Sequence, residues 1–212
     1  MLPSKEEWLR ALTERHGEHL QEKLLHTTVA VCGLGGLGSH IAICLARAGI
    51  GKLILIDFDQ VDLTNLHRQQ YKAAQIGMTK CDALAENLSE ISPYTEIETH
   101  NVKITNNNMN ELLQNADIIC EAFDRAEEKA MLVDGIFERM PEKYLVAGSG
   151  MAGLGSANTI KTRKITSHFI LCGDEASDVA DGIGLVASRV MLCAAHQAHA
   201  VIRIIAGETN FQ

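Results

Sequence analysis

The stretch VAVCGLGGLGSHIAICLARAGI at residues 29–50 decides the fold. It starts with an apolar run that meets a glycine cluster, and apolar side chains then recur at helical spacing from Ile41 to Ile50. This order indicates a buried strand, a tight turn and a helix. A second apolar run, KLILID, ends on Asp57, so the unit is strand-helix-strand and should have the right-handed crossover of a parallel sheet.

The rest of the chain continues this alternation. Helical patterns and strand-like runs follow one another, the helices at 80–91 and 127–140 and the strands at 95–102, 115–123 and 144–150. After Gly155 the pattern predicts two short strands, a polar segment and a long apolar helix from about Ile183. We therefore expect an α/β protein with a Rossmann-like, doubly wound, mostly parallel sheet, an antiparallel C-terminal extension and a long C-terminal helix.

Length and composition favour one globular domain over residues 1–212. Residues 1–25 form an N-terminal helical segment, since positions 5 to 24 have an amphipathic pattern with no strand behind them; this helix should pack on the domain or on a partner chain. The polar sequence CGDEASDVADG at 172–182 is expected to be a mobile crossover loop.

The charge and the cysteines narrow the class of protein. A formal net charge of -8 gives no electrostatic reason to expect a nucleic-acid partner. The charged N-terminus lacks the apolar core of a signal peptide, and no run is long enough to span a bilayer, so we expect a cytoplasmic protein with no membrane partner. The six cysteines are scattered singly and should be buried thiols rather than disulfides or zinc ligands.

The glycine turn predicts a nucleotide. Gly33, Gly35 and Gly38 satisfy G-x-G-x-x-G between a strand and a helix, where free backbone N–H groups and the helix dipole favour a phosphate. Asp57, at the end of the next strand, stands where a carboxylate accepts hydrogen bonds from ribose hydroxyls. Both features fit NAD equally well, so on this evidence alone a nicotinamide-dependent oxidoreductase stays an equal alternative.

Polar residues downstream of the turn favour ATP. The sequence DFDQVDLTNLHRQQ brings Asn65, Arg68 and Gln69 to the expected nucleotide, and GMTK adds Lys80 at a helix start. An NAD site does not need these groups. Cleavage of ATP between its α and β phosphates does, because fixed donors must hold the negative charge on the phosphate oxygens.

Four segments together resemble the ThiF/MoeB family of carrier-protein adenylyltransferases, which are relatives of the ubiquitin-activating enzymes: GLGGLGS, ARAGIGKLILIDFDQVDLTNLHRQ, GMTK and ICEAFD. The resemblance runs through most of the chain from about Val29. It is strongest to the short ThiF-like proteins of thiamin biosynthesis, through EAFDRAEEKAML and GSGMAGLGSANTIKTRK.

The resemblance implies a site and a reaction. It assigns Asn65, Arg68 and Lys80 to the triphosphate, Asp57 to the ribose, and Asp124 to Mg²⁺, for which a carboxylate at the end of a parallel strand is a suitable ligand. The full set implied for the nucleotide is Gly33, Gly35, Gly36, Gly38, Asp57, Asp59, Asn65, Arg68, Gln69, Lys80 and Asp124.

The implied substrate is the C-terminal glycine carboxylate of a small β-grasp sulfur-carrier protein ending in Gly-Gly. Its attack on the α-phosphate of ATP gives an acyl-adenylate and pyrophosphate. The family also implies a homodimer in which an arginine from the neighbouring subunit assists, and Arg10 and Arg15 are the candidates for it. Thiamin biosynthesis is the favoured pathway, with molybdopterin-type or other carriers, and a non-catalytic activating subunit, as alternatives.

The chain departs from the family in three respects. It has no C-x-x-C pair, so the structural zinc of longer relatives is not expected. Arg125 follows Asp124 where the family commonly has asparagine. Some relatives carry the activated acyl group on a cysteine of the crossover loop; the only cysteine near that loop here is Cys172, for which a packed thiol at a strand end is the favoured interpretation.

Overall fold

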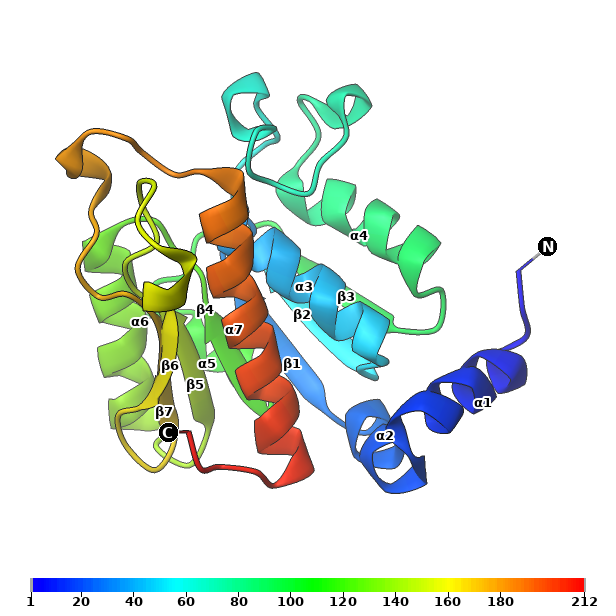
Figure 1. The fold of residues 1–212 in the computed structure, drawn as a ribbon. Helices are drawn as coiled ribbons and strands as arrows, with labels where there is room; N and C mark the ends of the chain where they lie inside the picture. Colours follow the sequence, from blue (N-terminus) through cyan, green and yellow to red (C-terminus); the bar gives the residue numbers. More distant parts are fainter. Residues whose placement is uncertain (1, 212) are drawn as a thin grey trace.

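A parallel sheet forms the centre of the molecule. The computed structural model describes residues 2–211, and within them seven strands form one sheet in the order β3-β2-β1-β4-β5-β7-β6 (Figure 1). All neighbours are parallel except β6 and β7, which are antiparallel. The strands are β1 (Thr28–Cys32), β2 (Lys52–Ile56), β3 (Glu96–His100), β4 (Ile118–Glu121), β5 (Tyr144–Gly148), β6 (Lys161–Lys164) and β7 (Phe169–Gly173).

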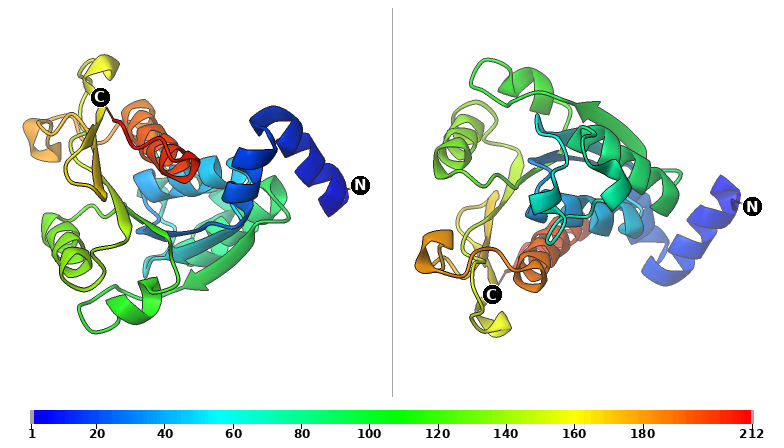
Figure 2. Two further views of the ribbon diagram at one scale, coloured as in Figure 1. Left: turned by 90° about the horizontal axis from the view of Figure 1, so that it is seen from below. Right: turned by 90° about the horizontal axis from the view of Figure 1, so that it is seen from above.

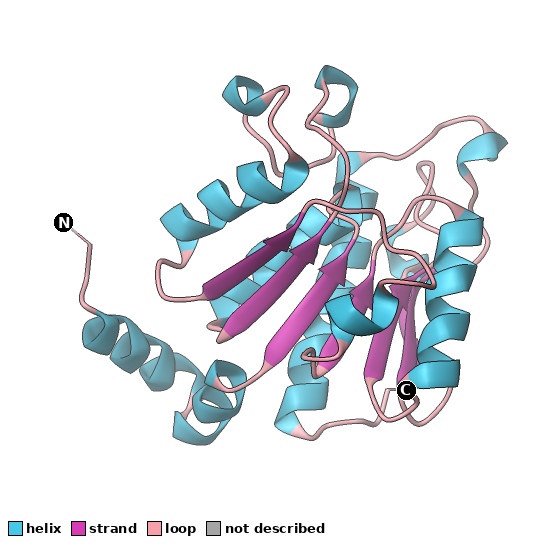
Figure 3. Ribbon diagram, turned by 180° about the vertical axis from the view of Figure 1, so that it is seen from behind, coloured by secondary structure: helices cyan, strands magenta, loops and turns pink. Residues whose placement is uncertain are grey.

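Helices cover both faces of this sheet (Figure 3). One face packs against α3, α4 and α7, and the other against α5 and α6. The helices are α1 (Lys5–His16), α2 (Glu18–Leu25), α3 (Gly36–Ala48), α4 (Lys80–Ile91), α5 (Met109–Leu113), α6 (Ala126–Arg139) and α7 (Ala187–Ala206). The predicted doubly wound α/β fold, with an antiparallel β6–β7 pair and a long C-terminal helix, is confirmed.

Strand residues alternate between two apolar cores because successive side chains point to opposite faces of a sheet. In β1, Val29 and Val31 pack with α3 and α7, whereas Ala30 and Cys32 pack with α5 and α6. All four are fully buried. This two-sided burial explains why the strand reads as a continuous apolar run rather than as an alternating one.

The N-terminal segment differs from the single helix predicted over residues 5 to 24. Gly17 has a positive φ of 79°, which ends α1 and starts α2. Helix α1 buries none of its residues and extends away from the body of the molecule (Figure 2), and it is tied to it by Trp8, whose ring centroid lies 6.5 Å from that of Tyr94.

The last helix begins at Ala187, four residues later than predicted. The residues before it are extended because their backbone pairs with another loop: Leu185 forms a bridge with Ala152, and Gly153 N–H donates to the carbonyl of Gly184. Within residues 2–211, no helix combines the length and the apolar character needed to cross a membrane.

Candidate functional site

A cleft opens at the carboxyl ends of the strands, where the sheet reverses its winding. Strand β1 lies between β2 and β4, so the chain leaves β1 toward one side of the sheet and leaves β4 toward the other. The cleft between these two connections has a volume of about 1000 Å³. Ten residues of the predicted site lie on its wall: Gly33, Gly35, Gly36, Asp57, Asp59, Asn65, Arg68, Gln69, Lys80 and Asp124.

The glycine turn passes very close to other backbone. Gly33 has a φ of +91°, and a Cβ there would lie 2.8 Å from the carbonyl oxygen of Ala122 at the end of β4. No side chain caps the N-terminus of α3, which follows directly. The turn therefore presents uncapped backbone N–H groups toward the cleft, as an anion site at a helix N-terminus requires.

Asp57 holds the glycine turn in place through its carboxylate. Its Oδ2 accepts a hydrogen bond from Leu34 N–H at 2.6 Å, and its Oδ1 accepts one from Asp59 N–H at 2.8 Å. Burial raises the pKa of the Asp57 carboxyl, while the Lys80 ammonium and the two N–H donors oppose that rise. Asp57, which is predicted to bind the ribose, therefore also holds in place the backbone that would face the phosphates.

The Lys80 ammonium group lies beside Asp57 and Asp59. Thr79 caps the N-terminus of α4 through its hydroxyl, which places Lys80 on the first turn. Its Nζ lies 2.6 Å from Asp59 Oδ2 and 3.9 Å from Asp57 Oδ2. The Lys80 side chain is buried, whereas that of Asp59 is half exposed at 50%, so the partner of this ammonium group faces solvent.

Arg68 and Gln69 have buried polar atoms that no described residue satisfies. Among residues 2–211, the Nε of Arg68 and the Oε1 of Gln69 are buried without a hydrogen-bond partner. Leaving such groups unpaired is costly in a folded protein. Because both residues line the cleft, these atoms suit a bound polar ligand.

Asp124 is the exposed carboxylate at the β4 side of the cleft. Within residues 2–211, no three His, Cys, Asp or Glu side chains converge as a metal site. Mg²⁺ is usually held by one or two carboxylates together with substrate phosphates, so a single carboxylate in a phosphate-binding cleft fits that ion. The absent C-x-x-C pairs and this donor set do not fit a structural zinc.

Apolar residues that sequence reasoning missed line one end of the cleft: Phe58, Val102, Ile104, Phe123 and Val133. Phe58 and Val102 expose 49% and 36% of their surface, so part of each apolar side chain is open to a ligand in the cleft. Phe58 comes just after β2, Val102 just after β3 and Phe123 just after β4. Their position directly after a parallel strand is the signal that would have identified them.

Three predicted site residues lie outside this cleft. Gly38 is buried in α3, where a Cβ would lie 1.8 Å from the carbonyl oxygen of Gly33, so it permits the tight packing of the turn without lining the cleft. Arg10 and Arg15 are exposed on α1. They do not reach the cleft of their own chain, and their action in a neighbouring subunit stays a prediction.

The cysteines are confirmed as free thiols, and all but Cys44 are buried. Cys172 is 0% exposed on β7, and burial raises the pKa of its thiol to about 12. Its Sγ donates to Thr162 Oγ1, which also bonds His196 Nδ1 at 2.8 Å. Cys172 is therefore the packed thiol expected at a strand end, and His196 has a structural contact.

The crossover segment folds against the rim of the cleft. A buried ion pair joins Asp174 to Arg189 of α7, and the Arg189 guanidinium also donates to the carbonyls of Gly155 and Ser156. Ser177 N–H and hydroxyl donate to Asp174 Oδ1. These bonds tie residues 150–156 to the crossover segment; its mobility stays a prediction.

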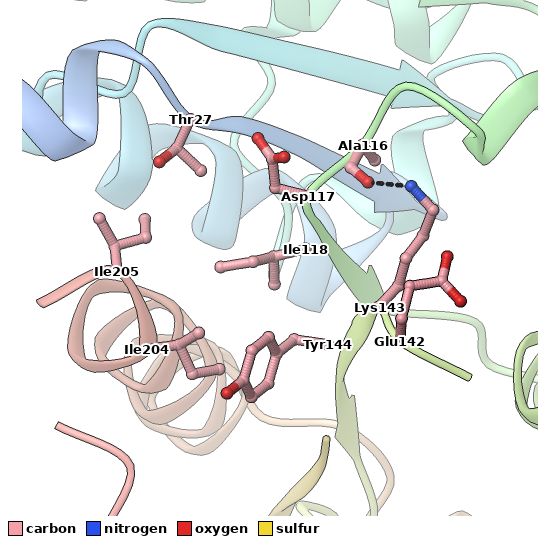
Figure 4. Close-up of a pocket in the computed structure, with 9 residues that line it drawn as sticks. All are labelled: Thr27, Ala116, Asp117, Ile118, Glu142, Lys143, Tyr144, Ile204 and Ile205. Carbon is pink, nitrogen blue, oxygen red and sulfur yellow. Dashed lines mark hydrogen bonds between the residues drawn. The ribbon is translucent and has the colours of Figure 1, made fainter. Parts of the chain in front are cut away.

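A second cavity of about 400 Å³ lies at the opposite ends of the strands (Figure 4). Thr27, Asp117 and Tyr144 are part of its lining. Its one cation, Lys143, already donates to the carbonyls of Gln114 and Ala116. The larger cleft at the carboxyl ends, which holds the predicted nucleotide-binding residues, is the better candidate site.

Two curated relatives match part of the chain. The adenylyltransferase and sulfurtransferase MOCS3 of Aedes aegypti is 38% identical over 132 residues, which cover 62% of this chain and 30% of that protein. The ubiquitin-like modifier-activating enzyme 5 of Drosophila willistoni is 49% identical over 84 residues, which cover 40% of this chain and 21% of that protein. The matches thus span less than a third of each relative.

One solved structure matches nearly end to end. The E. coli tRNA N6-threonylcarbamoyladenosine dehydratase TcdA, in complex with ATP, superposes with a TM-score of 0.86 at 20% identity, covering 98% of both chains. At this identity the likeness concerns the fold. The sequence pattern of the ThiF family matches residues 9–212, and we conclude that this chain belongs to the ThiF family.

Proposed function

We propose that this protein is an ATP-dependent adenylyltransferase that activates the C-terminal carboxylate of a small sulfur-carrier protein. The observation that carries the proposal is the convergence, in one cleft, of an uncapped helix N-terminus with Arg68, Gln69 and Lys80. Two of these side chains hold buried polar atoms without partners. Membership of the ThiF family and the ATP bound by TcdA support ATP, rather than NAD, as the ligand of this cleft.

In the proposed reaction, a carboxylate oxygen of the carrier attacks the α-phosphorus of ATP, the bond from that phosphorus to the bridging oxygen breaks, and pyrophosphate leaves. The product is a mixed anhydride of the carrier glycine and AMP. Arg68 and Lys80 neutralise the negative charge that two approaching anions bring together. The glycine turn fixes the phosphates through backbone N–H groups, and the apolar side chains near Phe58 take the adenine base.

Asp124 would hold Mg²⁺ in this proposal, and Asn65 would reach the phosphates. When bound, the ion would neutralise charge on the phosphate oxygens. Asp59 then gains a second role. Its half-exposed carboxylate holds the Lys80 ammonium group at the cleft before the nucleotide arrives, and phosphate oxygens then take the place of that carboxylate.

ATP–pyrophosphate exchange tests the proposal. Labelled pyrophosphate should enter ATP only when a β-grasp carrier ending in Gly-Gly is supplied, because the reverse reaction needs the acyl-adenylate. A carrier with its last glycine removed serves as the control. Absence of exchange with every carrier would overturn the proposal.

The pathway follows from the carrier that supports exchange. We assign the chain to thiamin thiazole biosynthesis on its resemblance to the short ThiF-like proteins, so a ThiS-like carrier should give the highest kcat/KM. A molybdopterin-type carrier is the alternative and forms the second arm. A tRNA bearing N6-threonylcarbamoyladenosine, the substrate class in the name of TcdA, forms the third arm; the net charge of -8 argues against it.

We further propose that the protein acts as a homodimer in which α1 reaches the partner's cleft. Helix α1 buries nothing within its own chain and carries Arg10 and Arg15 on an exposed surface. Sedimentation should show a dimer. Mixing Arg10→Ala or Arg15→Ala protein with a chain defective in its own cleft should then distinguish an arginine that acts across the interface from one that does not.

A further inference from the structure

A pair of opposite charges outside the predicted site joins a fully buried carboxylate, Glu121, to Lys129, which is 27% exposed and lines the cleft. Glu121, the last residue of β4, is 0% exposed. Its Oε2 lies 2.5 Å from Nζ of Lys129 on α6, and its Oε1 accepts a hydrogen bond from Phe123 N–H at 2.7 Å. Lys129 Nζ also donates to the carbonyl of Gly148, the last residue of β5, at 2.8 Å.

These contacts close a loop of chain. The connection from β4 to α6 is residues 122–125, and the Glu121–Lys129 pair joins its two ends. Four cleft-lining residues, Ala122, Phe123, Asp124 and Arg125, lie between them. The bond to Gly148 ties the same ammonium group to the start of the neighbouring loop, which lines the cleft at Ser149 and Gly150.

Helix α7 secures the same strand ends from the other face. The Nε2 of Gln197, which is fully buried, donates to the carbonyl of Glu121 at 3.0 Å and to that of Val146 at 3.3 Å. Gln197 thus joins the backbones of β4 and β5 on one face, and Lys129 joins the Glu121 side chain to the β5 backbone on the other. Only the Lys129 bridge includes the loop that carries Asp124.

The pair is costly unless both partners are present. Burial raises the pKa of the Glu121 carboxyl, and the Lys129 ammonium is the largest opposing influence, followed by the N–H donors. The other titratable groups facing this carboxylate are the thiols of Cys32, Cys120 and Cys193, and burial raises the pKa of each. Lys129 is therefore the only cation that compensates this charge within residues 2–211.

We propose that Lys129, through Glu121 and Gly148, is the positioning residue that sets the β4–α6 loop, and with it Asp124, at the distance from the glycine turn that bound Mg-ATP requires. The two connections run close together here: Ala122 N–H donates to the carbonyl of Cys32 at 2.9 Å, and a Cβ on Gly33 would lie 2.8 Å from the Ala122 carbonyl oxygen. A movement of the loop beyond Ala122 would therefore change the distance between Asp124 and the glycine turn. The inference rests on the proposed function only for the identity of the nucleotide.

The test compares Mg-ATP affinity in four proteins at pH 6.5 and 8.5 by isothermal titration calorimetry: wild type, Lys129→Met, Lys129→Arg and the double variant Glu121→Gln with Lys129→Met. Lys143→Met is the matched control, because Lys143 likewise makes two hydrogen bonds, to the carbonyls of Gln114 and Ala116, but lies at the opposite end of the sheet. Near-UV circular dichroism establishes that each variant is folded at each pH.

In Lys129→Met, the uncompensated carboxylate should push the loop out of place when it is ionised and relax when it is protonated. We expect Kd to rise about tenfold at pH 8.5 and clearly less at pH 6.5. The double variant has no charge to bury, so its affinity should not depend on pH in this way. Lys129→Arg should restore most of the affinity, and Lys143→Met should bind as wild type does.

Equal Kd values for wild type and Lys129→Met at both pH values would overturn the inference, as would a loss of the same size at both pH values in Lys129→Met and in the double variant. If Lys129→Met does not fold at pH 8.5, the double variant and Lys129→Arg decide: weak binding by a folded Lys129→Arg overturns it. If wild type itself does not bind Mg-ATP, the proposed function fails instead.

Discussion

Two connections border the cleft, and they are fixed by different means. The connection from β1 to α3 is residues 33–35 and contains two glycines, with a third, Gly36, at the start of α3; it has no side-chain cap and passes close to the backbone at Ala122. The connection from β4 to α6 contains no glycine and is closed by the Glu121–Lys129 pair. The first depends on the absence of side chains and the second on two particular ones.

A matching contrast separates the two lysines. Lys80 pairs with Asp59, whose side chain is 50% exposed, and it also lies 3.9 Å from the buried Asp57, so phosphate oxygens can replace Asp59 at that ammonium group while it stays beside Asp57. Lys129 pairs with a carboxylate that has no exposed surface. A ligand that displaced it would strand that charge in the interior. The lysine with the exposed partner suits contact with substrate, and the other suits positioning.

The largest effect is expected when the Glu121–Lys129 pair, which closes the β4–α6 connection, is broken. Lys129→Met leaves Glu121 buried without its cation, which should lower the free energy of unfolding by about 3–5 kcal/mol near pH 8. The folded-state pKa of Glu121, already raised by burial, rises further when Lys129 is lost, so stability is retained below the unfolded-state pKa and falls as pH rises through the folded-state value. Urea denaturation of wild type and variant at several pH values should show a gap that widens with pH.

The gap between the two proteins is the informative quantity, because other groups titrate equally in both. The double variant Glu121→Gln with Lys129→Met should not show the widening. A gap that stayed constant between pH 5.5 and 8.5 would contradict an ionised Glu121 as the cause.

The next largest effect is expected when a side chain is added to the β1–α3 connection. In Gly33→Ala, the new Cβ meets the carbonyl oxygen of Ala122 at 2.8 Å and requires a φ of +91°, so the cost should be about 3 kcal/mol or more. Gly77→Ala is the matched control, because Gly77 has a φ of +89° with nothing within 4 Å of a Cβ, and it should cost only about 1 kcal/mol. Equal shifts of the urea midpoint in the two variants would mean that close approach contributes nothing.

The two connections also differ in how much of them the sequence predicts. A G-x-G-x-x-G turn between a strand and a helix has one common structural reason, so Gly33 and Gly35 could be assigned from their spacing. Asp124 was assigned by the family resemblance, and its position at a strand end that faces the crevice agrees with that assignment. Charged residues such as Glu127, Glu128 and Lys129 near a helix start are typical of a solvated face, so the sequence alone does not identify Lys129; tertiary structure brings its partner Glu121 to it.

Helix ends show the same limit. The start of α4 at Lys80 could be predicted because Thr79 is a local cap. The start of α7 could not, because the extended residues before it are held by Ala152 and Gly153, about 30 positions earlier in the chain. Local signals predict the elements, and contacts between distant segments correct their ends.

A smaller effect on the free energy of unfolding is expected at Lys80, whose partner can be replaced by phosphate oxygens. Lys80→Met keeps the buried stem but removes the charge, so ATP–pyrophosphate exchange should fall about 100-fold. The buried Asp57 keeps its two N–H donors but loses the cation 3.9 Å away, so the free energy of unfolding should fall by about 2 kcal/mol. Lys72→Met removes a lysine from the surface pair with Glu90 outside the cleft and should leave exchange unchanged. A Lys80→Met protein that exchanged at the wild-type rate would remove Lys80 from the proposed catalytic residues.

The smallest effect is expected at Cys172, which lies on β7 behind the cleft. Its thiol is fully buried, has a pKa of about 12 and donates to Thr162, so it is neither exposed nor ionised near neutral pH. Cys172→Ala should leave exchange unchanged and cost about 1 kcal/mol of stability through lost packing. Non-reducing gels of the wild type with carrier and ATP should show no conjugate that a reducing agent cleaves. A conjugate present in wild type and absent in Cys172→Ala, but retained in Cys44→Ala, would require β7 to move and would make this thiol an acceptor of the acyl group.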